Sequence, residues 1–186
     1  MLLCAVLAGR TCSVAAEYRV EETRLGPVHA RAQSAVASGD GCHVAYVVTE
    51  GREQFVVMDG VEGPRYDAIS EDGPVLSPDG ARMAFVAQKG QGQLVVVDGI
   101  AGPVYDGIEP ASLSLRSDGK RVAYIARKGN KYLAVVDGVA GPEYDSIGKG
   151  TPIFSLGGER FAYVAAEGEK QLGVVEGMAG GEGEGG

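Results

Sequence analysis

The sequence has 186 residues, of which 45% are hydrophobic and 23% are charged, and its formal net charge is −8. This length suits one domain with a real core. The negative charge excludes nucleic acid and anionic membranes as expected partners, because both repel an acidic protein at long range. The 30 glycines and the lack of tryptophan indicate many tight turns, which is typical of short antiparallel strands.

The chain begins with a short apolar run over residues 1–9. Small residues at Val14 and Ala16 suit cleavage before Glu17, so we expect residues 1–16 to be a signal peptide and the protein to be periplasmic or extracellular. No basic residue precedes this run and the run is short, so the alternatives are a buried first strand or a misassigned start. No other segment approaches the roughly 18 apolar residues of a membrane span.

Four copies of a 39-residue repeat follow, and they align without gaps. Two Asp-Gly series carry the period, with aspartates at Asp40, Asp79 and Asp118 and at Asp59, Asp98 and Asp137. A Gly-Pro series starts at Gly63, Gly102 and Gly141, and a Tyr-Asp series starts at Tyr66, Tyr105 and Tyr144. Several series that agree in period define a repeat protein. We predict repeats over residues 17–177, with copies starting near 31, 70, 109 and 148.

Each copy alternates between strand-forming runs and turns. In the second copy the expected strands are residues 82–87, 94–97, 104–108 and 113–115. Asp-Gly between apolar runs predicts a hairpin, because glycine accepts a positive φ without a Cβ clash. Four short strands in about 40 residues are typical of one blade of a β-propeller. The fold class is therefore predicted as all-β, a propeller of four-stranded antiparallel blades.

The ends leave the number of blades open. Residues 178–186 are rich in glycine and glutamate, so we expect a disordered tail there and no outer strand in the fourth copy. Residues 21–38 resemble the end of a copy and could supply the missing strands. The chain is then either a closed ring of four blades or an arc of a larger propeller.

Residues 77–86 and 116–125 resemble the signature of WD40-like repeats in TolB-type propellers, and residues 38–47 and 155–164 are looser copies. The resemblance covers residues 31–186. It implies a periplasmic or extracellular binding module, or a non-catalytic domain attached to a peptidase. A propeller fold by itself does not define an activity.

No pattern of catalytic or cofactor-binding residues stands out, so we expect no enzyme activity, cofactor or metal. His43 occupies the position of Arg82, Arg121 and Arg160 in the other copies and is interpreted as a structural variant. The aspartates of the Asp-Gly pairs are interpreted as caps of backbone N–H groups; a ring of carboxylates that holds Ca²⁺ is the alternative. Tyr66, Tyr105 and Tyr144 are expected to pack between blades.

The candidate partner-binding face follows from strand direction. The first and third turns of a blade share one end, and the second turn shares the other end with the link between blades. The loops at that second end vary between copies and are free to carry recognition. The candidate residues there are Glu71, Asp72, Lys89, Glu109, Lys128, Lys131 and Lys149. We expect a non-enzymatic scaffold that binds another protein with an acidic or mixed-charge surface; the alternative is an accessory propeller domain of a larger enzyme such as a serine peptidase.

Overall fold

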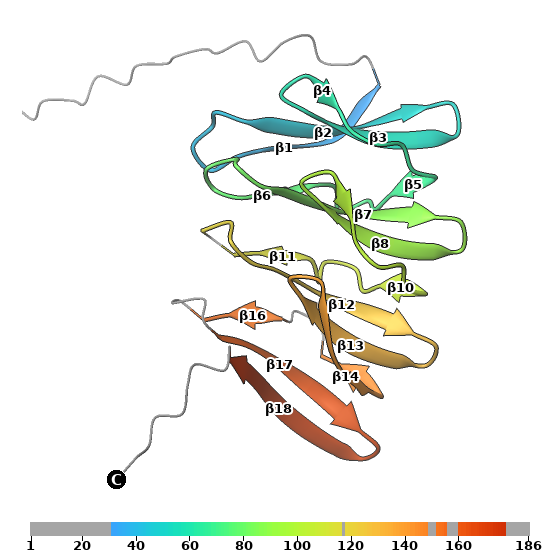
Figure 1. Cartoon of the computed structure of the whole chain (residues 1–186), viewed down its shortest axis with the longest axis vertical. Helices are drawn as coiled ribbons and strands as arrows, with labels where there is room; N and C mark the ends of the chain where they lie inside the picture. The colour runs from blue at the N-terminus through green and yellow to red at the C-terminus, as the bar shows by residue number, and fades with distance from the viewer. Residues whose placement is uncertain (1–30, 117, 149–151, 156–159, 178–186) are drawn as a thin grey trace, which may run out of the picture.

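The computed structural model describes residues 31–116, 118–148, 152–155 and 160–177, and these residues contain strands and turns but no helix. The predicted signal peptide and the predicted glycine-rich tail lie outside the described residues. Figure 1 shows four antiparallel sheets stacked in chain order from blue to red. The all-β prediction is confirmed. The sheets form an open stack in the described part of the chain, and no closed ring is shown.

The strands fall into the four sheets as follows. The first sheet contains β1 (Ala32–Ala37), β2 (Val44–Glu50), β3 (Glu53–Met58) and β4 (Val61–Glu62). The second contains β5 (Ala68–Ile69), β6 (Val75–Leu76), β7 (Met83–Lys89), β8 (Gly92–Val97) and β9 (Ile100–Ala101). The third contains β10 (Gly107–Ile108), β11 (Ser114–Leu115), β12 (Val122–Lys128), β13 (Lys131–Val136) and β14 (Val139–Tyr144). The fourth contains β15 (Ser146–Ile147), β16 (Ile153–Phe154), β17 (Arg160–Glu167) and β18 (Lys170–Gly177).

The repeat appears directly in the strand positions. β2, β7 and β12 begin at residues 44, 83 and 122, which are 39 apart. β5 and β6 both pair with β7, so they are two parts of one inner strand that a bulge interrupts. Counted in this way, the first three sheets each have four strands. Residues 40–69, 79–108 and 118–147 share one strand layout, and their described residues contain no helix.

One predicted strand is wrong in its boundaries. Residues 104–108 were expected to form a single strand, but Tyr105 pairs with Gln93 in the second sheet while Gly107 and Ile108 pair with β12 in the third. The chain therefore passes from the outer strand of one sheet to the inner strand of the next at Asp106. No loop separates the two strands, so the sequence pattern predicts one continuous strand.

Each inner sheet buries apolar side chains on both faces. In the second sheet Phe85 and Leu94 join the cluster shared with the first sheet, and Ala84 and Val86 join the cluster shared with the third. These four side chains are all buried. A strand with two covered faces is apolar at nearly every position, which is why β7 and β8 are continuous apolar runs.

The Tyr-Asp pairs tie neighbouring sheets together. The ring centroid of Tyr66 lies 5.9 Å from that of Phe85, and Tyr105 and Tyr144 make equivalent edge contacts with the following sheet. The next residue, Asp67, accepts the N–H of Gly90 at 2.6 Å. Asp106 and Asp145 bind the matching glycines in the next two sheets. The predicted packing of the tyrosines between sheets is confirmed.

A half-buried amide supports two of the three joints between sheets. The side-chain oxygen of Gln54 accepts the N–H of Ile69 at 2.6 Å, and Gln93 binds Ile108 in the same way at 2.7 Å. Both bonds run from the third strand of one sheet to the first strand of the next. The third sheet carries Tyr132 at the corresponding position, so its joint with the fourth sheet lacks this amide bond.

The second Asp-Gly series forms two-residue hairpin turns. Asp98 and Gly99 have φ values of 51° and 79°, which is the pattern of a type I′ turn. The Asp98 carboxylate accepts the N–H of Met83 at 2.9 Å and the guanidinium N–H of Arg82 at 2.7 Å. Asp59 and Asp137 have equivalent contacts. The interpretation of these aspartates as backbone caps is confirmed.

The glycines of the first Asp-Gly series generate a stability prediction. Gly41 and Gly80 both have positive φ values, 71° and 64°. A Cβ on Gly41 would meet open space, whereas one on Gly80 would overlap the His43 ring. We expect Gly41→Ala to cost about 1 kcal/mol through the backbone alone and Gly80→Ala to cost about 1–3 kcal/mol more through the overlap. Urea unfolding of both variants measures the difference; equal losses would show that His43 does not press on Gly80.

Candidate binding groove

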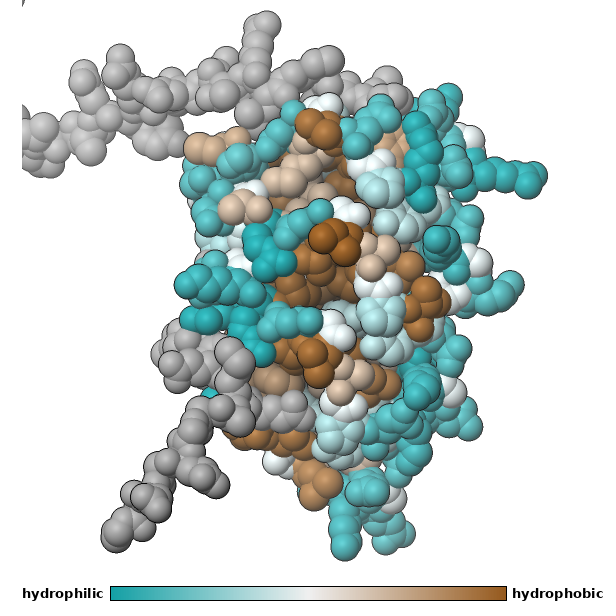
Figure 2. Space-filling model, viewed as in Figure 1, coloured by the Kyte–Doolittle hydropathy of each residue, from teal (hydrophilic) through white to brown (hydrophobic). Residues whose placement is uncertain are grey.

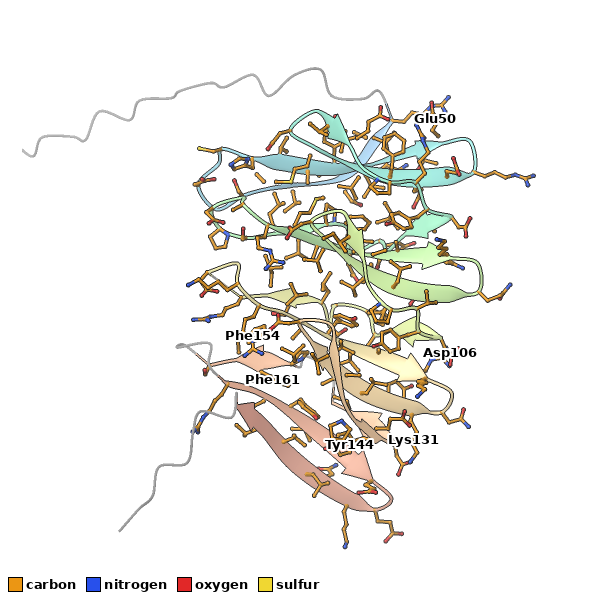
Figure 3. The ribbon with its side chains drawn as sticks, viewed as in Figure 1. Glu50, Asp106, Lys131, Tyr144, Phe154 and Phe161 are labelled. Atoms are coloured by element: carbon orange, nitrogen blue, oxygen red, sulfur yellow. The ribbon has the colours of Figure 1, made fainter. Side chains whose placement is uncertain are left out.

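The predicted lysines lie at the hairpin end that also carries the links between sheets. Lys128 donates to Glu143 at 3.0 Å and Lys131 donates to Asp145 at 2.6 Å. Figure 3 shows Lys131 and Asp106 at this end of the sheets. The Lys89 ammonium has no hydrogen bond or ion pair with the residues that the structure describes. Lys149 lies outside the described residues. Of the candidate lysines that the structure describes, Lys128 and Lys131 are thus bound by carboxylates of their own chain and Lys89 is not.

The predicted acidic residues lie elsewhere, in the bulges of the inner strands. Glu71 and Asp72 fall between β5 and β6, and Glu109 follows β10. The Asp72 carboxylate accepts the N–H of Ala111 at 3.0 Å, so it joins the bulges of two neighbouring sheets. Asp72 and Glu109 line a small hollow of about 200 Å³. The structure therefore brings Asp72 and Glu109 together, and neither lines the hollow that Lys128 lines.

A larger hollow of about 340 Å³ lies between the second and third sheets on the side of the outer strands. Its lining is apolar along the walls and charged at the rim. The lining residues are Arg82, Val95, Val97, Asp98, Ile100, Ala101, Gly102, Pro103, Lys120, Val122, Tyr124, Asp137 and Gly138.

A second hollow of about 350 Å³ continues along the same outer strand. Its lining residues are Val104, Tyr105, Asp106, Lys128, Leu133, Ala140, Gly141 and Glu143. Asp98 and residues 100–103 line the first hollow and residues 104–106 line the second, so both follow the same stretch of chain. We call them together the outer groove. It begins near Lys120 and ends near Lys128, which is one of the predicted binding residues.

Exposed aliphatic side chains mark the face that contains the groove. Ile100 is 75% exposed and Val104 is 58% exposed, and both belong to the groove lining. Val61 and Val139, which follow the Asp-Gly turns of the neighbouring sheets, are 71% and 73% exposed. Figure 2 shows apolar residues gathered down the middle of this face between hydrophilic margins. A contiguous apolar surface of this kind is typical of a binding site.

Prolines restrict how a partner can use this face. Pro142 lies within β14, and Pro64 and Pro103 lie two residues after the ends of β4 and β9. Proline has no N–H to donate, and it is a common protection of an edge strand against pairing with another chain. A partner on this face would therefore contact side chains in the groove rather than extend a sheet.

The charged side chains that line the groove differ in the contacts that restrain them. Arg82 binds Asp98 and donates to the carbonyl of Gly119 at 3.0 Å, so its guanidinium is fixed. The exposed Lys120 ammonium has no hydrogen bond or ion pair within the described part of the chain. Burial raises the pKa of the Tyr124 hydroxyl far above its ordinary value, so this lining residue stays neutral. Lys120 is the cation of the first hollow that can reach a ligand.

The sequence patterns missed Ile100, Val104 and Lys120 as candidate residues. The signal for the first was present, because an aliphatic residue follows the Asp-Gly turn at positions 61, 100 and 139. Among the described residues, no three His, Cys, Asp or Glu side chains gather where they could hold a metal ion. No helix in that part of the chain is long and apolar enough to cross a membrane.

The observations define an all-β repeat protein with an apolar groove between two of its sheets. No family model matches the chain, and no curated protein matches it. Among solved structures, the chain is similar to the structure named as putative TolB from Agrobacterium tumefaciens, with 14% identity and a TM-score of 0.42. The match covers 80% of this chain and 58% of that chain, so this chain spans less than two thirds of its length.

The stability of the first sheet depends on pH through His43, which lies at the end of the sheet that carries the Asp-Gly turns. Its Nδ1 lies 2.7 Å from the Asp59 carboxylate, where Arg82 and Arg121 make the equivalent contacts in the next two sheets. The hydrogen bond to Asp59 raises the pKa of His43 above 6.5, although desolvation opposes the shift, and the charges of Asp40 and Asp79 act in the same direction as Asp59. The hydrogen bond to His43 lowers the pKa of Asp59 below 3.8.

The folded protein should therefore lose stability as the pH rises through the titration of His43. A raised folded-state pKa means that the contribution is fully present below pH 6.5 and is lost above the folded-state pKa. The lowered pKa of Asp59 means that its own contribution is lost only as the pH falls below 3.8. His43→Arg keeps the charge and should flatten the fall in Tm between about pH 6 and 8. Parallel Tm profiles for the two proteins would contradict the role of the pair.

Proposed function

We propose that the chain is a non-enzymatic, propeller-type binding module whose outer groove takes an extended segment of another protein. One observation carries the proposal: Ile100 and Val104 stand exposed over a groove that the second and third sheets form together. Aliphatic side chains exposed to water lose free energy when a partner covers them, by roughly 25 cal/mol per Å² of apolar area. Ile100 is 75% exposed, so most of its apolar surface is available to a partner.

The groove also suggests the chemistry of the segment that binds there. Its walls suit one or two aliphatic or aromatic side chains beside Ile100 and Val122. A carboxylate of the partner would reach Lys120 at one end of the groove. At the other end, Lys128 already forms an ion pair with Glu143. The chain has a net charge of −8, so a uniformly acidic partner would be repelled. The partner segment is therefore apolar in the middle, with a single acidic group near Lys120.

The site of action belongs to the same proposal. The apolar run over residues 1–9 and the small residues before Glu17 support export to the periplasm or the outside of the cell. The partner is then a protein of that compartment. Expression of the full sequence with a C-terminal tag tests the location, because export would leave a tagged product that begins at Glu17 and appears outside the cytoplasmic fraction.

The binding proposal is tested with displayed random peptides selected on the purified chain, followed by fluorescence anisotropy with the best peptide. Ile100→Glu should weaken binding at least tenfold, which corresponds to about 1.4 kcal/mol. Val139→Glu is the matched control, because it follows the equivalent Asp-Gly turn, is 73% exposed and does not line the groove. Lys120→Glu should reduce binding of an acidic peptide.

Two outcomes would contradict the groove. The first is unchanged binding by Ile100→Glu. The second is loss of binding by Lys89→Glu while Ile100→Glu binds normally, which would place the site on the lysine-bearing end. Reversal of Asp98 or Asp137 is not a useful control, because these carboxylates hold backbone N–H groups of the hairpins.

A further inference from the structure

The joint that forms the groove has a counterpart between the first and second sheets, 39 residues earlier in the sequence. The Asp-Gly turns and the Gly-Pro pair are the same in both joints. Three other lining positions differ in bulk: the groove has Val97, Ala101 and Val122 where the first joint has Met58, Glu62 and Met83. Met58 and Met83 pack in the apolar cluster of the first joint. The shorter side chains therefore leave more room between the second and third sheets.

Two further lining positions add polar groups to the groove. Lys120 stands in the place of Ala81, and Tyr124 stands in the place of Phe85. Tyr124 is buried, and its hydroxyl oxygen would lie 3.9 Å from a Cβ added at Gly102, another lining residue. The hydroxyl is therefore part of the wall of the groove. The changes that widen this joint are thus accompanied by a cation and a hydroxyl at positions where the first joint has a methyl and a phenyl group.

The Tyr124 hydroxyl still has capacity for a further hydrogen bond. The rings of Tyr105 and Tyr124 meet edge to face, with their centroids 6.3 Å apart. Burial contributes most to the raised pKa of Tyr124, and the charge of an ionised Tyr105 and a hydrogen bond with Tyr105 also raise it. A hydrogen bond raises the pKa of a hydroxyl when that hydroxyl donates it, because donation stabilises the neutral form. The Tyr124 oxygen therefore keeps a lone pair, and Tyr105 keeps a proton to donate.

The polar groups of the groove lie at a spacing that an extended chain can match. Lys120, Val122 and Tyr124 alternate in the sequence and line the same hollow. Alternate residues of an extended chain face the same side, and the chain rises about 3.3 Å per residue. Lys120 and Tyr124 are therefore separated by at most about 13 Å along the groove. An extended segment that lies along β12 has the same rise, so its residues i, i+2 and i+4 face these three side chains.

We propose that the segment bound in the outer groove carries an acidic, an aliphatic and an uncharged polar side chain at alternate positions, and that the Tyr124 hydroxyl selects the polar one. This inference rests on the proposed function and names the chemistry of the segment. The acidic side chain pairs with Lys120, and the aliphatic one packs against Ile100 and Val122. The polar one, from Ser, Thr, Asn or Gln, hydrogen-bonds to Tyr124.

The hydroxyl makes the groove selective at the polar position. An apolar side chain over Tyr124 would displace water and leave the spare hydrogen-bonding groups of Tyr105 and Tyr124 without a partner, which weakens binding. A charged side chain would lose its own hydration, because the lining of this hollow includes the apolar side chains of Val95, Val97 and Val122. A neutral hydroxyl or amide avoids both losses. Sites that hydrogen-bond a substrate group discriminate more strongly against an analogue that lacks it than apolar pockets do.

The test selects displayed random peptides on the full chain and on Tyr124→Phe. Peptides selected on the parent should carry an acidic residue four positions from Ser, Thr, Asn or Gln, with an aliphatic residue midway. Peptides selected on Tyr124→Phe should keep the acidic and aliphatic positions and lose the preference for a polar residue. The variant should fold, because Phe85 fills the same position of the second sheet and is buried. Tyr163→Phe is the matched control, since Tyr163 makes the same edge contact with Tyr144 and does not line the groove.

Calorimetry then measures whether the hydroxyl and the polar side chain of the peptide interact. Replacing the polar residue of the best peptide with an apolar residue of similar shape should weaken binding to the parent and to Tyr163→Phe about tenfold, but binding to Tyr124→Phe less than about twofold. Equal weakening in all three proteins, or selected peptides without a polar residue at this spacing, would overturn the inference and leave the proposed function intact if Ile100→Glu abolishes binding. If Ile100→Glu binds normally, or if no peptide is selected, the proposed function and the inference both fail.

Discussion

The structure depends on the burial of both faces of each sheet. A single four-stranded sheet of this sequence cannot be stable in water, because side chains such as Phe85 and Val86 point to opposite faces and both are apolar. The second and third sheets therefore depend on the sheets that cover both of their faces. Other features follow from this constraint, including the continuous apolar strands, the exposure of Val164 at the end of the stack, and the position of the groove between two sheets.

Burial of apolar surface does not fix the position of one sheet relative to the next, whereas hydrogen bonds between the sheets do. Apolar contacts have little direction, so sheets could slide over one another without losing much area. The Asp67 carboxylate on Gly90 and the Gln54 amide on Ile69 fix each sheet relative to the next at the ends of short strands. The Asp98 carboxylate fixes a hairpin and also holds Arg82, which reaches the following sheet through Gly119. Polar groups of the repeat thus supply specificity, while the apolar groups supply most of the free energy.

Much of this fold could be predicted from the sequence, because the repeat is encoded in local turn chemistry. Asp-Gly pairs require a positive φ, and their spacing gave the correct hairpins in three sheets. The strand boundaries at residues 104–108 could not be predicted, because which sheet a residue joins depends on partners such as Gln93 and Arg127, which are distant in sequence. The groove was missed for the same reason. Lys128 was found by its charge, but its bond to Glu143 and its place beside Leu133 come from the packing of separate strands.

Tyr132, which replaces the glutamine of the other sheets, has a consequence for cooperativity. The joint between the third and fourth sheets lacks the half-buried amide bond and has an exposed ion pair between Lys131 and Asp145. Exposed pairs contribute little and weaken with ionic strength. In a nearest-neighbour description of a repeat array, the coupling between the third and fourth units then lacks the contribution of this hydrogen bond. The amide hydrogens of β17 and β18 would exchange through a local opening that leaves the first three sheets folded, and only those three sheets would report the global free energy of unfolding.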